Sequence, residues 1–341
     1  AERILWYEGD ARLSSTLTRR ADPFVLTSLM YSMQEGRPLE VRGAPVSGGL
    51  LRNLEEFQRA WASWRTRLSE IPIFAEEEDD ELNGHDRAAV VGFSGGVDSC
   101  YTVYRHLVSP DGRYDRKLQA ALMIHGFDIS LDDAAQFEAA RRRSQRILDG
   151  LGIDLLAIRT NIKSLSEQSL DWLDSHGLVL GSALTLLSGR FGAGIIAGTM
   201  PYVMLLPLGS SPVTDWLMGS RRFEIVHHGA QASRLDKVRT IARWPAAIEN
   251  LRVCWAGKQL DRNCGVCLKC VLTQLQFWAV GANVSCFDNP LSEKVVRHAL
   301  DIPSFSRLDW VDLHAVLREA QERKLSAPWL AFLEKKLRMS G

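Results

Sequence analysis

The sequence predicts a mixed α/β fold built around a largely parallel sheet. Two observations support this prediction. Short apolar segments alternate with segments that have helical periodicity, and glycine and polar residues separate the two kinds. In addition, 46% of the 341 residues are hydrophobic and 24% are charged, which is typical of a globular chain large enough for one core with additions. We therefore expect strands connected by right-handed helical crossovers.

The predicted elements follow one another from residue 88 onward. The apolar segment 88–93 is bounded by polar residues and predicts a buried strand, with a helix expected over 97–107. A second helix should begin near Asp132 and Asp133, and its apolar residues share one face until Gly150 and Gly152 end it. The other predicted strands cover residues 118–125, 155–158, 194–197 and 223–226.

An acidic run over residues 76–81, followed by Asn83 and Gly84, predicts an exposed linker. It separates an N-terminal extension (1–85) from a core segment (86–285). The last segment (286–341) shows helical spacing, for example at Trp310, Leu313 and Leu317, and we interpret it as a helical tail that serves packing.

Charge and hydropathy narrow the classes of partner. The chain has 41 basic and 41 acidic side chains, so a broad nucleic-acid-binding face is not expected, and the basic residues 141–143 are interpreted as a solvated helix face. No segment has the ~18 consecutive apolar residues of a membrane span, and the first residues carry no apolar signal segment. We expect a cytoplasmic protein without a membrane partner.

One motif follows the first predicted strand and opens the next helix. We call it the glycine loop; it consists of Ser94, Gly95, Gly96, Val97, Asp98 and Ser99. Glycines let the backbone approach an anion, and a helix start offers unpaired N–H groups. An aspartate is unfavourable in a purely anionic pocket, so Asp98 is predicted to hold Mg²⁺. The alternative is a capped strand-to-helix turn without a ligand.

Four of the six cysteines lie within 17 residues in the pattern C-x9-C-x2-C-x2-C. This cysteine quartet consists of Cys254, Cys264, Cys267 and Cys270. Thiolates at two-residue spacing suit tetrahedral Zn²⁺, and four sulfur ligands leave no open position, so the predicted zinc is structural. An iron–sulfur cluster and redox-active thiols are the alternatives. Outside the quartet, Cys100 is interpreted as a buried apolar residue rather than a nucleophile, and Cys286 stands apart.

The glycine loop string SGGVDS resembles the signature of the PP-loop ATP pyrophosphatases, the adenine nucleotide alpha hydrolase-like superfamily. Combined with the quartet, it is most similar to the 7-cyano-7-deazaguanine synthase (QueC) family, over about residues 86–285. The resemblance implies binding of ATP by the glycine loop, Mg²⁺, zinc, and transfer of AMP to an acidic substrate with release of pyrophosphate. The extension 1–85 and the segment 208–215 depart from the family pattern.

The resemblance also implies roles for individual residues outside the two motifs. Lys237 would place a cation near the phosphates, with a solvated helix lysine as the alternative. His125 and Gly198 follow strands where the superfamily binds the nucleotide, although a core or capping role for His125 is equally compatible. Asp215 would contact the substrate or act as a loop residue. The pair His227 and His228 should point to opposite faces of a strand end.

The leading hypothesis is an ATP-dependent enzyme that adenylates a carboxylate such as 7-carboxy-7-deazaguanine and then forms an amide, a nitrile or a conjugate. The acceptor could be a small molecule, a protein or another macromolecule, and a specialised role such as antiphage defence stays open, as does a homodimer. The alternatives are a sulfurtransferase, which needs a reactive free cysteine, and a non-catalytic nucleotide-binding subunit.

Overall fold

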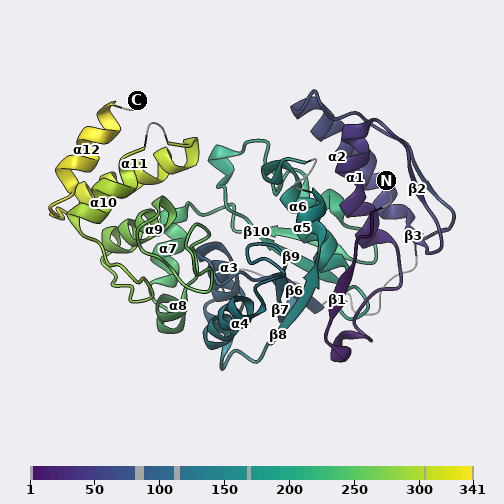
Figure 1. Ribbon diagram of the computed structural model, residues 1–341, viewed down its shortest axis with the longest axis horizontal. Helices are drawn as coiled ribbons and strands as arrows, with labels where there is room; N and C mark the ends of the chain where they lie inside the picture. The colour runs from purple at the N-terminus through teal and green to yellow at the C-terminus, as the bar shows by residue number, and fades with distance from the viewer. Residues whose placement is uncertain (1–2, 81–87, 111–115, 167–169, 303–304, 340–341) are drawn as a thin grey trace. The chain divides into compact units, whose positions relative to one another are not determined.

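The computed structural model describes residues 3–80, 88–110, 116–166, 170–302 and 305–339 (Figure 1). The chain forms two compact units. Unit 1 contains Ala1–Phe93, Arg105–Asp132 and Leu151–Gln231, and unit 2 contains Ser94–Tyr104, Asp133–Gly150 and Ala232–Gly341. These units cut across the three consecutive segments expected from the sequence, because parts of the central segment belong to each unit.

Unit 1 contains a six-stranded sheet with the order β1-β8-β7-β6-β9-β10, in which β1 and β10 form the edges (Figure 1). Strand β1 pairs antiparallel with β8, and all other neighbouring strands of this sheet pair in parallel. The predicted α/β class with a mostly parallel sheet is confirmed. The strands are β1 (Tyr7–Gly9), β6 (Ala88–Gly92), β7 (Lys117–His125), β8 (Asp154–Thr160), β9 (Ala193–Ala197) and β10 (Glu224–His228).

The five strands predicted from the sequence match β6 to β10 to within two residues at each end. Their apolar runs are easy to detect because the central strands are covered on both faces; Ala89, Val90 and Val91 in β6 are fully buried. Strand β6 lies between β7 and β9, and the chain returns from β8 to β9 on the opposite side of β6. Ligands of open α/β sheets bind at such a reversal, beyond the carboxyl ends of the strands.

The N-terminal extension is part of unit 1 and of its hydrophobic core. Helices α1 (Asp22–Glu35) and α2 (Gly48–Trp64) contribute buried side chains that include Leu29 and Trp61. Two small parallel sheets accompany them, one formed by β2 (Leu39–Val41) with β4 (Ile73–Ala75) and the other by β3 (Val46–Ser47) with β5 (Glu78–Asp79).

The acidic run predicted as an exposed linker is exposed at Glu76, Glu77 and Glu78, but Asp79 and Asp80 are half-buried and part of the run is a strand. Residues 78–79 form β5, and Asp79 accepts a hydrogen bond from Arg20 at 2.6 Å. Asp80 accepts hydrogen bonds from the Gly49 N–H at 2.7 Å and from Arg52 at 2.8 Å. Arginines and a backbone N–H group of the extension donate hydrogen bonds to these acidic residues. The composition of the run does not predict such contacts. Residues 81–85, the end of the predicted linker and extension, lie outside the described ranges.

Helix α6 (Trp172–Thr185) fills the connection from β8 to β9 after the short helix α5 (Ile162–Ser166). It packs against α1, β6 and β9. Two glycines of α6 allow close contacts. A Cβ at Gly181 would lie 3.0 Å from the Met218 sulfur, and a Cβ at Gly177 would lie 1.7 Å from the carbonyl oxygen of Gly209. The α6 backbone can therefore approach the β9–β10 connection closely, which fixes the segment around residue 209.

Unit 2 is helical. Helix α3 (Val97–Val103) continues into a wider helical turn over residues 104–108, so the helix predicted for 97–107 is α-helical only in its first part. The tail helices pack on α7 and α9 around buried residues such as Leu235, Leu275 and Leu313. The helices are α4 (Ala134–Leu148), α7 (Arg234–Ile241), α8 (Pro245–Asn250), α9 (Leu268–Ala279), α10 (Glu293–Leu300), α11 (Arg307–Glu322) and α12 (Leu330–Met339).

Among the helices of the described ranges, none combines the length and apolar character that crossing a bilayer requires.

Candidate functional site

The glycine loop continues from the end of β6 and is partly accessible to solvent. Ser94 is exposed, Gly96 and Asp98 are half-buried, and Val97 and Ser99 are buried. Gly95 has a φ of 73°, a left-handed conformation that favours glycine, and a Cβ there would lie 3.1 Å from the Ser144 hydroxyl. The loop therefore depends on glycine at position 95 and has one side that solvent can reach.

Asp98 binds two cations of helix α7. Its Oδ1 accepts a hydrogen bond from Lys237 Nζ at 2.9 Å, and its Oδ2 accepts one from Arg234 Nη1 at 3.0 Å. Burial alone would raise the pKa of Asp98, but attraction by Lys237, Arg234 and then Lys269 outweighs it, so the pKa is lowered. Lys237 is fully buried, which contradicts the solvated-lysine alternative. Both carboxylate oxygens of Asp98 accept hydrogen bonds from these cationic side chains. The Mg²⁺ role of Asp98 stays a prediction.

Helix α7 presents these two cations on one face because they are three residues apart. A capping box fixes the start of the helix: the Ser233 hydroxyl accepts a hydrogen bond from the Asp236 N–H at 3.2 Å, and the Asp236 carboxylate accepts one from the Ser233 N–H. Arg234 was not predicted as a site residue. The spacing R-x-x-K after a capping serine was the available signal.

Arg252, which the sequence did not indicate, binds two backbone carbonyl groups of the glycine loop. The Arg252 N–H donates to the Gly95 carbonyl at 2.8 Å, and Arg252 Nε donates to the Ser94 carbonyl at 3.3 Å. These bonds occupy the carbonyl oxygens of Ser94 and Gly95, which would otherwise repel an anion, and the Gly96 N–H donates to the Ser94 hydroxyl at 3.3 Å. Arg252 lies two residues before Cys254, so one segment links the loop to the quartet.

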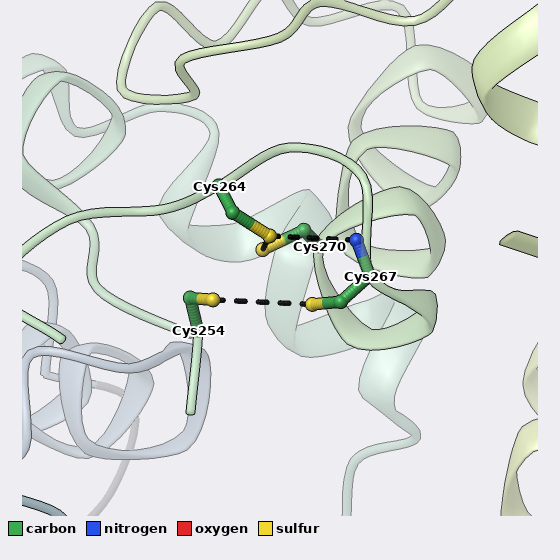
Figure 2. Close-up of side chains that lie close together, drawn as sticks. All are labelled: Cys254, Cys264, Cys267 and Cys270. Atoms are coloured by element: carbon green, nitrogen blue, oxygen red, sulfur yellow. Dashed lines mark hydrogen bonds between the residues drawn. The ribbon is translucent and has the colours of Figure 1, made fainter. Parts of the chain in front are cut away.

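The cysteine quartet is assembled as predicted. Its four sulfur atoms lie within 4.8 Å of one another and turn toward a common centre (Figure 2). The Cys254–Cys267 and Cys264–Cys270 sulfur distances are both 3.9 Å. A tetrahedral site with Zn–S bonds of about 2.3 Å requires sulfur–sulfur distances of about 3.8 Å; two pairs of the quartet are close to this distance, and all pairs lie within 4.8 Å. These residues could hold such an ion, and four sulfurs would complete its coordination.

Asn263, which sequence inspection missed, organises the backbone around the quartet. Its Oδ1 accepts hydrogen bonds from the N–H groups of Val253 and Cys254, and its Nδ2 donates to the carbonyls of Leu251 and Cys286. Asn263 is fully buried. Gly265, between Cys264 and Cys267, has a φ of 76°, and a Cβ there would lie 2.2 Å from the Asn289 carbonyl oxygen, so the turn inside the quartet requires glycine.

The two cysteines outside the quartet are buried and unpaired. Burial is the largest cause that raises the pKa of Cys100, and burial also raises the pKa of Cys286 to about 11. A thiol must ionise to act as a nucleophile, so neither residue has the environment of a reactive cysteine. This agrees with the interpretation of Cys100 as a buried apolar residue.

In unit 1, His125 and Gly198 follow the carboxyl ends of β7 and β9. His125 is buried, and its Nε2 lies 2.8 Å from the Ser130 carbonyl oxygen across the turn at Gly126. This contact favours the capping role that the sequence left open. Gly198 donates its N–H to the His228 carbonyl at 2.8 Å and stays a predicted nucleotide contact.

Asp215 is fully buried at the start of a short 3₁₀ turn (Asp215–Met218). Its Oδ1 accepts the Ser211 N–H at 2.9 Å, and its Oδ2 accepts the Ser210 hydroxyl at 2.8 Å and lies 2.7 Å from His227 Nδ1. Asp215 thus makes three contacts inside the protein and has no exposed surface, which favours the loop role over direct substrate contact. His227 and His228 have different surroundings, as expected: the His228 ring lies 4.6 Å from that of His106.

Asp312, on helix α11 of unit 2, is a further titratable residue that the sequence did not single out. Burial raises its pKa from the ordinary 3.8 to about 6; nearby Arg234 opposes this shift, whereas Asp98 adds to it. The tail, interpreted above as packing alone, thus contributes a carboxyl group to the surroundings of Asp98 and Arg234.

Comparisons with protein-family models, with curated proteins and with solved structures found no match to this chain.

Proposed function

We propose that the protein is an ATP-dependent adenylating enzyme of the PP-loop pyrophosphatase type, most similar to the QueC family. One observation carries this proposal: the accessible glycine loop lies beside Lys237 and Arg234, which together exceed the charge of Asp98. Two cations held by one carboxylate leave a net positive charge, which an anion such as a polyphosphate would neutralise.

In the proposed reaction, a substrate carboxylate oxygen attacks the α-phosphorus of ATP. A new P–O bond forms, the bond to the β-phosphate oxygen breaks, and pyrophosphate leaves with the electron pair. Lys237 and Arg234 would bind the leaving pyrophosphate, and the loop N–H groups would hold it in place, so catalysis is mainly positioning and charge stabilisation. Mg²⁺, when bound, would neutralise phosphate oxygens; Asp98 is the candidate ligand.

The quartet would hold structural zinc in this proposal. Zinc bound there would join the segment around Cys254 to helix α9, which begins directly after Cys267. Because Arg252 binds the glycine loop from the same segment, the metal would also stabilise the loop backbone.

The environment of the free cysteines supports adenylation over sulfur transfer. A PP-loop sulfurtransferase would need an accessible thiolate, whereas burial raises the pKa of both Cys100 and Cys286. If the quartet binds zinc, its thiolates are unavailable as well. Quantifying bound zinc together with free thiols tests this point.

The decisive experiment is ATP–pyrophosphate exchange with a panel of carboxylic acids that includes 7-carboxy-7-deazaguanine. Wild-type protein should exchange label in the presence of its acid, and Lys237→Gln should lower the rate at least ~100-fold, the range for losing one charge-stabilising donor. Arg239→Gln is the matched control, because Arg239 lies on the same helix but pairs with Asp236 and Glu319. Nucleotide binding without exchange for any acid would favour the non-catalytic subunit.

A further inference from the structure

The N-terminal extension contains a groove that has no part in the proposed adenylation site. We call it the extension groove; its volume is about 490 Å³. One wall consists of residues 39–44, which are strand β2 and the turn after it, and the other consists of residues 18–21 and one face of helix α1. At one end the Ala21 N–H donates to the Pro45 carbonyl at 3.0 Å, which joins the two walls. The whole groove therefore lies within unit 1.

The extension groove runs along an edge of β2 that has no neighbouring strand. Among the described strands β2 pairs with β4 alone, and all three residues of β2 line the groove, whereas none of β4 does. The Leu39 N–H donates to the Pro72 carbonyl at 3.0 Å, on the β4 side. The Val41 carbonyl accepts the Glu76 N–H at 3.0 Å on the same side. Backbone groups of consecutive strand residues point to opposite sides, so the N–H and C=O of Glu40 point away from β4.

The apolar side chains of the groove lie on both of its walls. Leu39 and Val41 are half-buried and pack against the hydrophobic core, so they lie on the same face of β2. Phe24, on the facing wall, is a large apolar side chain that is still 40% exposed. In a strand placed beside β2, each residue on this face would have an apolar β2 neighbour on one side and the Phe24 ring on the other. An apolar residue is therefore favoured there.

One cation of the groove has no counter-charge. Arg19 is exposed and makes no ion pair with any other described residue. The next residue, Arg20, is bound by two aspartates at 2.9 and 2.6 Å, and Glu40 is bound by Arg42 of its own wall. These pairs compensate the other charges that line the groove, so Arg19 determines the sign of the charge that a ligand should carry. A carboxylate would complement it.

We propose that the extension groove binds an extended peptide, which adds to the free edge of β2 as a third strand and places an acidic side chain beside Arg19. Backbone hydrogen bonds would supply the affinity, and Arg19 and Phe24 the selectivity, as in other cases of strand addition. Because β2 has three residues, the paired part of the peptide is short, ~10 Å at 3.3 Å per residue. The proposal concerns the extension alone and does not depend on the adenylation reaction.

A positional-scanning library of acetylated, amidated hexapeptides, captured on the full-length protein, tests the proposal. Wild type should enrich aspartate or glutamate at one position, with apolar residues two positions away, where side chains share a face. Arg19→Glu should select lysine or arginine at that position instead and should bind the wild-type choice at least ~tenfold more weakly. Arg12→Glu is the matched control, because Arg12 is an exposed arginine of the extension that pairs with Asp10 and does not line the groove.

Backbone methylation of the selected peptide tests strand pairing without changing the protein. Fluorescence polarisation should show that N-methyl groups at alternate positions weaken binding at least ~tenfold, since they remove donors to β2, whereas those between them are tolerated.

Three outcomes would overturn the proposal. Uniform tolerance of methylation would mean that the groove binds a carboxylate alone. An unchanged preference in Arg19→Glu, or no enrichment by wild type, would remove the peptide site. Peptide capture that falls as the protein concentration rises, together with a dimer in sedimentation, would make a second copy of this chain the occupant.

Discussion

Asp98 and Asp215 are two aspartates that the sequence marks as candidate ligand contacts, yet their surroundings differ in charge. Asp98 binds Lys237 and Arg234, and its side chain stays 19% exposed. Asp215 is fully buried and binds a serine hydroxyl, a backbone N–H and an imidazole. Asp98 binds two permanently charged side chains, whereas Asp215 orients the His227 imidazole, a type of group that can be neutral.

The two carboxylates therefore have different effects on the groups around them. Around Asp98, the three cations Lys237, Arg234 and Lys269 outnumber the carboxyl groups of Asp98 and Asp312, so the cluster should attract anions. Around Asp215, the contacts are a hydroxyl, a backbone N–H and an imidazole, so the carboxylate fixes the positions of these groups. The sequence motif marks both aspartates as candidate ligand contacts. Their hydrogen-bond partners show that their environments differ.

The largest expected effect comes from removing Asp98. Asp98→Ala leaves the fully buried Lys237 without its counter-charge, and we expect the free energy of unfolding to fall by about 3 kcal/mol, as for other broken buried pairs. Urea denaturation measures this. The double variant Asp98→Ala, Lys237→Met should recover much of the loss; no recovery would mean that the buried charge is not the cause.

Removing Asp215 should have a smaller effect, because its partners are mostly neutral. Asp215→Ala leaves one hydroxyl, one backbone N–H and His227 Nδ1 without their acceptor, which should cost about 2 kcal/mol in the free energy of unfolding. The same denaturation experiment measures it. Pyrophosphate affinity should not change, and a cost as large as that of Asp98→Ala would erase the contrast between the two sites.

Helix α7 should respond to the loss of its cap. Ser233→Ala removes the acceptor for the Asp236 N–H, and we expect a loss of about 1 kcal/mol in unfolding free energy. Because Arg234 is the first residue of this helix, pyrophosphate binding should weaken as well. Ser292→Ala, which removes the equivalent cap of α10, is the control: it should cost similar stability but leave pyrophosphate affinity unchanged.

Asp312 should give a pH dependence of stability with the opposite sign to that of Asp98. The pKa of Asp312 is raised in the folded protein, so folding binds a proton between about pH 4 and 6, and the stabilising contribution disappears as the pH rises through about 6. The lowered pKa of Asp98 instead contributes stability that is lost as the pH falls. Wild type should therefore lose stability relative to Asp312→Asn as the pH rises across this window; a flat difference would contradict it.

The sequence predicted the parts of the molecule whose signals are local. Strands β6 to β10 are short apolar runs between turn residues, and the quartet is defined by its spacing. The contacts that join distant segments could not be predicted. Arg252 contacts the glycine loop across more than 150 residues, and Asp79 and Asp80 are ordered by arginines of the extension. Long-range pairing of this kind depends on the fold and leaves no periodicity in the sequence.

Strand β1 has a consequence for how the protein meets other chains. Its residues Tyr7, Glu8 and Gly9 pair with Thr160, Arg159 and Ile158, so β1 covers the last three residues of β8 on that side. Without this short strand, β8 would offer a template on which a second polypeptide could add. The N-terminal strand thus takes the place of a second polypeptide along residues 158–160 of β8, and the edge of the sheet moves outward to the three-residue strand β1.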